Sequence, residues 1–80
     1  MKANQRFRTR KDLKGWVVYF ESEGPLEMPE LSAKVIEQLS EEKTRDDLIA
    51  FVKENYPYAN AEVEVDEVIE TLNNFSLLSL

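Results

Sequence analysis

The sequence contains no cysteine and no histidine among its 80 residues. Without cysteine, neither a disulfide framework nor a thiolate metal site is possible. Without histidine, the commonest general base and the commonest transition-metal ligand are missing. No apolar run exceeds five residues, the length of the segment from Trp16 to Phe20, so neither a membrane span nor a secretory signal is predicted. These absences favour a soluble, cytoplasmic protein that holds no metal and no cofactor.

Glycine and proline are also scarce, with two and three residues respectively, and they mark the boundaries of predicted elements. The length corresponds to one domain covering residues 1–80, with a single thin core. An apolar content of 42% is sufficient for folding and argues against disorder. Enzymatic activity is not favoured, because only carboxylates, lysine and tyrosine remain as catalytic groups and the core is too small for a deep pocket.

Positive charge is concentrated at the start of the chain. Residues 1–14 carry six basic residues and one acid, a net charge of +5, whereas residues 15–80 carry a net charge of −11. Arg6, Arg8 and Arg10 share one face of an extended segment. This basic lead-in either docks against an acidic patch of a partner or is a soluble, frayed start.

Three short antiparallel strands are predicted within the first thirty residues. Trp16 to Phe20 is rich in β-branched and aromatic residues, and Gln5 to Thr9 is a weaker candidate for the preceding strand. Gly24-Pro25 marks a turn, and Leu26 to Met28 alternates apolar and polar residues. Pro29 then ends the third strand.

The remaining sequence predicts three helices. Ser32 is a candidate cap for the first helix, although Leu31 or Glu30 could also begin its first turn. Thr44 opens a capping box with Asp47 for the second helix, after a short loop over residues 40–43. The third helix spans Val63 to Asn74. Apolar residues recur at helical spacing in each: Leu31, Val35, Ile36 and Leu39; Leu48, Ile49, Val52 and Tyr56; Val65, Val68, Ile69, Leu72 and Phe75. The predicted fold is α+β and winged helix-turn-helix-like, a three-stranded antiparallel sheet followed by three helices.

This order of elements resembles the PqqD-like family, also called the RiPP recognition element. The resemblance lies in Trp16 to Phe20 with Leu26 to Met28, in residues 32–39 followed by residues 44–49, and in residues 65–72 followed by Leu77-Leu78. Ser32-Ala33 corresponds to the opening of the family's first helix, and Asp66 to an aspartate that opens its third. Three positions depart from the family pattern: Glu30 replaces a frequent asparagine, Pro29 shortens the third strand, and Ser76 stands where glycine is frequent.

The resemblance implies a binding protein without catalytic activity. Its ligand is the leader peptide of a ribosomally made precursor, and its partner is a separate modifying enzyme, often a radical-SAM enzyme. Splicease-type, cyclase and lasso-type systems all remain open. The leader is implied to add as a strand beside the third strand and to pack against the third helix. The implied peptide-binding residues are Leu26, Glu27, Met28, Glu64, Val68, Ile69, Leu72 and Phe75.

Other interpretations remain. Each apolar residue of these stripes also fits a purely structural role in the core, and the acids fit a solvated surface. A winged-helix nucleic-acid-binding regulator is the main alternative, although the third helix contains no lysine or arginine to neutralise phosphates. An acyl carrier is disfavoured because neither Ser22 nor Ser32 stands in an Asp-Ser-Leu context. An unpaired edge strand is also compatible with a homodimer.

Overall fold

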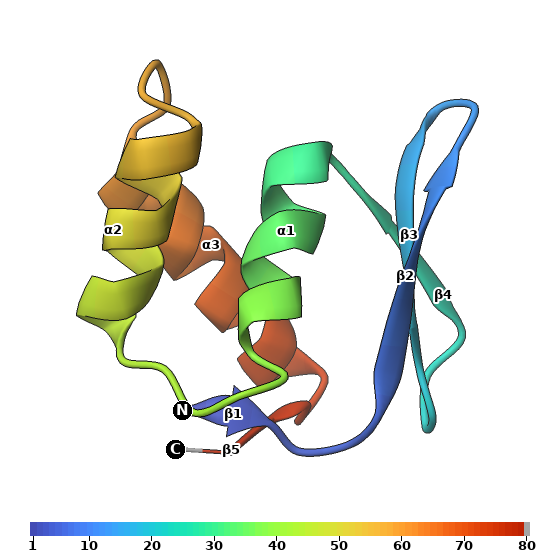
Figure 1. The fold of residues 1–80 in the computed structure, drawn as a ribbon. Coiled ribbons are helices and arrows are strands. Elements are labelled where there is room, and N and C mark those ends of the chain that lie inside the picture. Colours follow the sequence, from blue (N-terminus) through green and yellow to red (C-terminus); the bar gives the residue numbers. More distant parts are fainter. Residues whose placement is uncertain (80) are drawn as a thin grey trace.

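The computed structural model describes residues 1–79 and has an α+β fold in which a three-stranded antiparallel sheet precedes three helices, as the sequence predicts (Figure 1). The helices lie on one side of the sheet, and α1 stands between the sheet and the other two helices. The elements are β1 (Lys2–Ala3), β2 (Phe7–Asp12), β3 (Gly15–Phe20), β4 (Pro25–Met28), α1 (Glu30–Gln38), α2 (Arg45–Asn55), α3 (Ala61–Asn74) and β5 (Leu78–Ser79).

The main sheet has the strand order β2-β3-β4, so β3 is central and both neighbours are edge strands. Val18 and Phe20 are buried on the side that faces α1, because alternate residues of a strand point to opposite faces. Val17 points to the other face and is nevertheless buried. The central strand is therefore shielded on both faces, in agreement with its run of apolar residues.

Helix α1 starts earlier than the predicted cap allows. Its first residue is Glu30, and Pro29 occupies the cap position in an extended conformation without a side-chain hydrogen bond. Ser32 is therefore not the cap, since it lies inside the first turn, and the start at Glu30 is one of the alternatives that the sequence left open. The backbone closes this turn by itself, because the Ala33 N–H donates to the Pro29 carbonyl at 3.1 Å.

Helix α2 begins with the predicted capping box. The Asp47 N–H donates to the Thr44 hydroxyl at 3.1 Å, and the Asp47 carboxylate accepts from the Thr44 N–H at 2.9 Å. These bonds satisfy two of the backbone donors that a helix start leaves free. They hold the pKa of Asp47 below its ordinary value.

Helix α3 starts two residues earlier than expected, at Ala61, with Asn60 as its cap. Asp66 therefore lies within the helix and does not open it, which corrects the role that the family resemblance implied. At the far end, the Leu77 N–H donates to the Leu72 carbonyl at 2.9 Å and the Ser76 N–H donates to the Asn73 carbonyl at 3.0 Å. This is a Schellman motif, and Ser76 adopts the positive φ of 56° that it requires.

The start of the chain is paired and not frayed. β1 pairs with β5 in a second, two-stranded sheet near both ends of the described chain (Figure 1). The Ala3 N–H donates to the Leu39 carbonyl at 2.9 Å, and the Asn4 N–H donates to the Leu77 carbonyl at 3.0 Å. This clasp ties the ends of α1 and α3 together.

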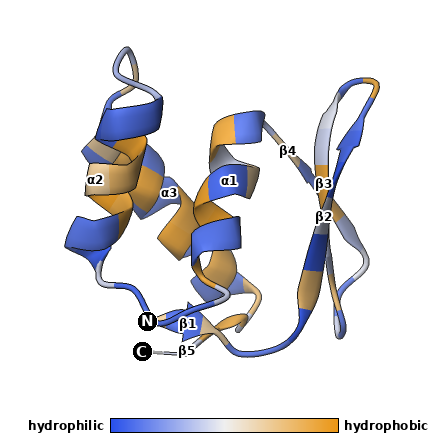
Figure 2. Cartoon of the chain, in the orientation of Figure 1, coloured by the Kyte–Doolittle hydropathy of each residue, from blue (hydrophilic) through white to orange (hydrophobic). Residues whose placement is uncertain are grey.

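The core is formed by the inner face of the sheet and by one face of each helix. Figure 2 shows hydrophobic residues where the three helices face one another and hydrophilic residues along much of β2. The most completely buried side chains are Ile36, Leu39, Leu48, Leu72, Leu77, Val18, Val35, Val52 and Val65. Within residues 1–79, the helices lack the combination of length and apolar character needed to cross a bilayer.

Candidate functional site

A groove of about 580 Å³ runs between β4 and α3, and we call it the β4–α3 groove. One wall is the edge strand, the other is the second half of α3, and the floor comes from α1. The lining residues are Pro25, Leu26, Glu27, Met28, Pro29, Ser32, Ile36, Glu67, Val68, Thr71 and Phe75. The groove thus contains five of the eight residues that the sequence nominated, from two segments that are forty residues apart.

The β4 wall is built from alternate residues. Leu26 stands opposite Val18 and Met28 stands opposite Trp16, so both side chains share the inner face of the sheet. Both are half-buried and pack against the edge of the core. Glu27 points to the other face and is exposed. The strand therefore offers two apolar side chains to the groove and one carboxylate at its rim.

The α3 wall ends in an exposed aromatic ring. Val68 is nearly buried, with 4% of its surface exposed, whereas Phe75 is 41% exposed. Thr71 lies between them on the same side of the helix, since residues three and four apart share one face. Phe75 is thus a large apolar side chain at the open end of an apolar groove.

Three nominated residues lie outside the groove. Leu72 is fully buried in the core, Ile69 is half-buried against the core, and Glu64 is half-buried one turn before Val68. Successive helical residues are rotated by about 100°. Leu72 and Ile69 therefore lie on one side of Val68, toward the core, whereas Thr71 and Glu67 lie on the other side, toward the groove.

The floor of the groove was missed in the sequence. Ser32 and Ile36 are one turn apart on α1 and lie between the two walls. Ile36 was assigned to the core, where 1% of its surface remains exposed, and Ser32 to a cap. No sequence signal distinguishes a core residue from one that also forms a groove floor, but the spacing of Val68 and Phe75 does point to Thr71.

The edge of β4 offers few hydrogen-bond donors. The Glu21 N–H donates to the Arg6 carbonyl across the sheet, which sets the alternation of bonded and non-bonded pairs between β2 and β3. The residues of β3 that do not bond to β2 bond instead to residues 26 and 28 of β4. The backbone groups of residues 25, 27 and 29 therefore point away from the sheet. Two of these are prolines, which have no N–H. Glu27 therefore supplies the one N–H donor at this edge.

Charge in the groove is entirely acidic. Glu67 lines it from the α3 wall, Glu27 stands at the rim of the β4 wall, and no lysine or arginine is among its described lining residues. The α3 wall is held against α2 by Arg45, whose Nε and Nη2 donate to the two Asp66 carboxylate oxygens at 2.7 and 2.9 Å. This hydrogen-bonded pair keeps the pKa of Asp66 below its ordinary value.

The start of α1 is anchored beside the groove. The Tyr56 hydroxyl, at the end of α2, donates to the Glu30 carboxylate at 3.0 Å. Burial, reinforced by this bond, raises the pKa of Tyr56 to about 12. The α3 wall and the α1 floor of the groove are thus connected to α2, which does not line the groove.

Comparison with known proteins identifies no relative: no family model, no curated protein and no solved structure matches the chain significantly.

Proposed function

We propose that the protein is a non-catalytic peptide-binding adaptor that captures an extended segment in the β4–α3 groove. The observation that carries this proposal is an apolar groove bounded on one side by an edge strand and on the other by a helix. An extended peptide beside β4 would exchange two hydrogen bonds with Glu27. Its alternate side chains would enter the groove between Leu26, Met28 and Phe75.

The groove also indicates what such a peptide carries. Apolar residues at every second position would meet the apolar walls, and a basic residue near them would meet Glu27 or Glu67. Because the two prolines limit the backbone ladder, side-chain packing would supply most of the affinity. The ligand in this proposal is the leader peptide of a ribosomally made precursor, with apolar residues at alternate positions and a basic residue near them. The partner would then be a separate modifying enzyme, for which a radical-SAM enzyme is our first candidate, and both would act in the cytoplasm.

Presentation of the peptide would be the adaptor's contribution to the reaction. A leader held in the groove raises the effective concentration of the attached core peptide at the partner's active site. The adaptor needs no catalytic group or cofactor of its own for this task. Winged-helix regulation through nucleic acid is the second candidate, favoured by the exposed arginines of β2 and opposed by the five acids of α3.

The direct test is fluorescence anisotropy of a labelled leader peptide, taken from a precursor encoded beside this gene and titrated with the protein. We expect saturable binding at micromolar concentration or tighter, on the order of −8 kcal/mol, and its loss with a scrambled leader. No leader binding together with binding of duplex DNA in a parallel titration would overturn the proposal in favour of the regulator.

A matched pair of variants locates the site. Phe75→Ala removes the exposed aromatic ring of the groove and is expected to weaken leader binding roughly tenfold or more. Tyr58→Ala removes a ring that is 84% exposed and lies outside the groove, and should leave the affinity unchanged. Equal affinities of the two variants would exclude the β4–α3 groove as the binding site.

A further inference from the structure

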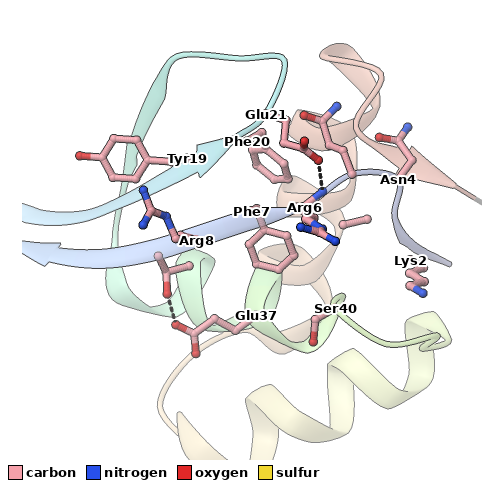
Figure 3. A pocket seen from close by; sticks show the side chains of 13 residues that line it. Lys2, Asn4, Arg6, Phe7, Arg8, Tyr19, Phe20, Glu21, Glu37 and Ser40 are labelled. Carbon is pink, nitrogen blue, oxygen red and sulfur yellow. Dashed lines mark hydrogen bonds between the residues drawn. The ribbon is translucent and has the colours of Figure 1, made fainter.

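The opposite edge of the sheet carries a second groove with different chemistry. It has a volume of about 1020 Å³ and follows β2 from the β1 clasp to Tyr19 (Figure 3). We call it the β2 groove. Its lining residues are Lys2, Ala3, Asn4, Gln5, Arg6, Phe7, Arg8, Thr9, Tyr19, Phe20, Glu21, Glu37 and Ser40. No described strand pairs with β2 on this side, so its backbone edge faces the groove.

The β2 edge has outward backbone N–H donors, whereas the β4 edge has prolines at two of its three outward positions. Because the Arg6 carbonyl accepts from the Glu21 N–H, alternate residues from Arg6 onward bond to β3. The intervening residues Phe7, Thr9 and Lys11 therefore direct both N–H and C=O outward. None of these backbone groups bonds to another part of residues 1–79. The β2 edge thus presents three donors and three acceptors in the spacing of a strand.

A row of arginines borders this edge on the outer face of the sheet. Arg6, Arg8 and Arg10 are exposed and alternate with Phe7 and Thr9, which face the helices. Figure 3 shows Arg8 beside Tyr19, its register partner on β3. Arg10 lies 6.0 Å from the centre of the Tyr19 ring, so this ring supports the row. Within the described residues, none of the three arginines forms an ion pair.

The inner side of the same edge carries an aromatic ring and a carboxylate in place of arginines. Phe7 packs on Phe20 with ring centres 5.4 Å apart, and the Glu37 carboxylate accepts a hydrogen bond from the Thr9 hydroxyl (Figure 3). A strand paired with β2 would place every second side chain beside the arginines and the others beside Phe7 and Glu37. The first set would be favoured as acids and the second as uncharged residues.

We propose that the β2 edge binds an acidic extended segment of a partner protein by strand addition, with acids at alternate positions opposite Arg6, Arg8 and Arg10. Two other occupants fit less well. A second copy paired through its own β2 would set arginine against arginine, which is repulsive. The phosphate backbone of a nucleic acid has no hydrogen-bond donors for the outward carbonyls of Phe7, Thr9 and Lys11.

The test uses a labelled, end-blocked peptide of alternating glutamate and threonine that is long enough to span β2. Anisotropy titrations at low ionic strength compare it with a block isomer of the same composition and with single-stranded oligothymidylate. We expect saturable binding of the alternating peptide and at least roughly tenfold weaker binding of the block isomer. Hydrogen exchange should slow at the Phe7, Thr9 and Lys11 amides when the peptide binds, and stay unchanged at Glu27.

Two charge reversals provide the matched control. Arg8→Glu is expected to weaken binding of the alternating peptide about tenfold. Lys53→Glu, a charge reversal of the same size at an exposed position on α2, should change that affinity less than about twofold. Equal binding of the block isomer, equal effects of the two reversals, or tighter binding of oligothymidylate would each overturn the proposal. So would the absence of saturable binding to the wild-type protein.

Discussion

At the scale of single residues, Ser76 has a backbone conformation that is unfavourable for its residue type. It has a φ of 56° at the end of α3, in the left-handed region that side chains with a Cβ atom disfavour. Glycine adopts this conformation without a steric penalty and is the usual residue at this point of a Schellman motif. The hydrogen bonds of the motif come from backbone groups, so they do not depend on the serine side chain.

Ser76→Gly is therefore expected to raise the free energy of unfolding by about 0.5–1 kcal/mol, after the greater freedom of glycine in the unfolded chain is subtracted. Urea denaturation measures it. Ser40→Gly is the control, because Ser40 is exposed in the loop after α1 and has no positive φ. That change should leave stability equal or slightly lower. A loss of stability in Ser76→Gly would contradict the conformation assigned to the end of α3.

Leu48 gives the complementary prediction about the core. Its side chain is fully buried between α2 and the other helices, so Leu48→Ala should lower the free energy of unfolding by about 2–5 kcal/mol. Leu13→Ala makes the same chemical change at a fully exposed position in the β2–β3 turn and should have little effect. Thermal denaturation of both variants tests this difference. An unchanged Tm for Leu48→Ala would show that α2 does not contribute its predicted face to the core.

At the scale of elements, the contact between Arg45 and Asp66 joins the start of α2 to α3. The two hydrogen bonds stabilise the ionised form of Asp66, so its pKa in the folded protein lies below the ordinary value of 3.8. A carboxyl with a lowered pKa contributes stability above its ordinary pKa and loses it as the pH falls through the folded value. Both side chains are substantially exposed, so the contribution is small.

Asp66→Asn should accordingly be slightly less stable than the wild type at neutral pH, and the difference should disappear as the pH falls below about 4. Urea titrations at a series of pH values measure this. Asp47 also has a lowered pKa, but it is present in both proteins and cancels in the comparison. A difference that persisted undiminished at low pH would mean that Asp66 acts through packing and not through its charge.

The elements also show where sequence reasoning succeeds. The three main strands and the capping box at Thr44 follow from local residue patterns. The family resemblance points to Leu26, Met28, Val68 and Phe75, which line the β4–α3 groove. Leu72 and Ile69 do not line the groove, and the sequence could not separate them from Val68 because a helical stripe identifies an apolar face but not which edge of that face borders a groove. The pairing of β1 with β5 was missed because a strand of two residues has no periodicity, and its partner lies more than seventy residues away.

At the scale of the whole molecule, the pairing of β1 with β5 joins the two ends of the described chain. The Ala3 N–H bonds to the Leu39 carbonyl, and the Lys43 N–H bonds to the Met1 carbonyl, so the first residues hold the loop between α1 and α2. Ala3→Pro removes the N–H and leaves the Leu39 carbonyl without this donor, at a cost of about 2 kcal/mol. Lys2→Ala changes an exposed neighbour and should be neutral. Urea denaturation of the two variants compares them, and equal stabilities would show that the clasp is dispensable.

The two grooves lie at opposite edges of one small sheet, separated by the central strand β3. The β4 edge has one N–H donor, apolar side chains and acids, whereas the β2 edge has three outward donors and a row of arginines. Segments that suit the two edges therefore differ in charge, and each edge favours one of the two proposed ligands. Under the two proposals, an adaptor with this arrangement would hold a peptide at one edge and a partner's acidic segment at the other.

This arrangement predicts simultaneous binding. When a labelled leader peptide is bound to the protein, adding the alternating glutamate-threonine peptide should leave the leader's anisotropy unchanged. Adding an unlabelled leader should displace the labelled one and lower its anisotropy. Phe75→Ala should weaken only the leader, and Arg8→Glu only the acidic peptide, because each side chain lines one groove alone. Displacement of the leader by the acidic peptide would mean that the two ligands share a site. In that case the sheet would use one edge at a time, and the protein would exchange its ligands without linking them.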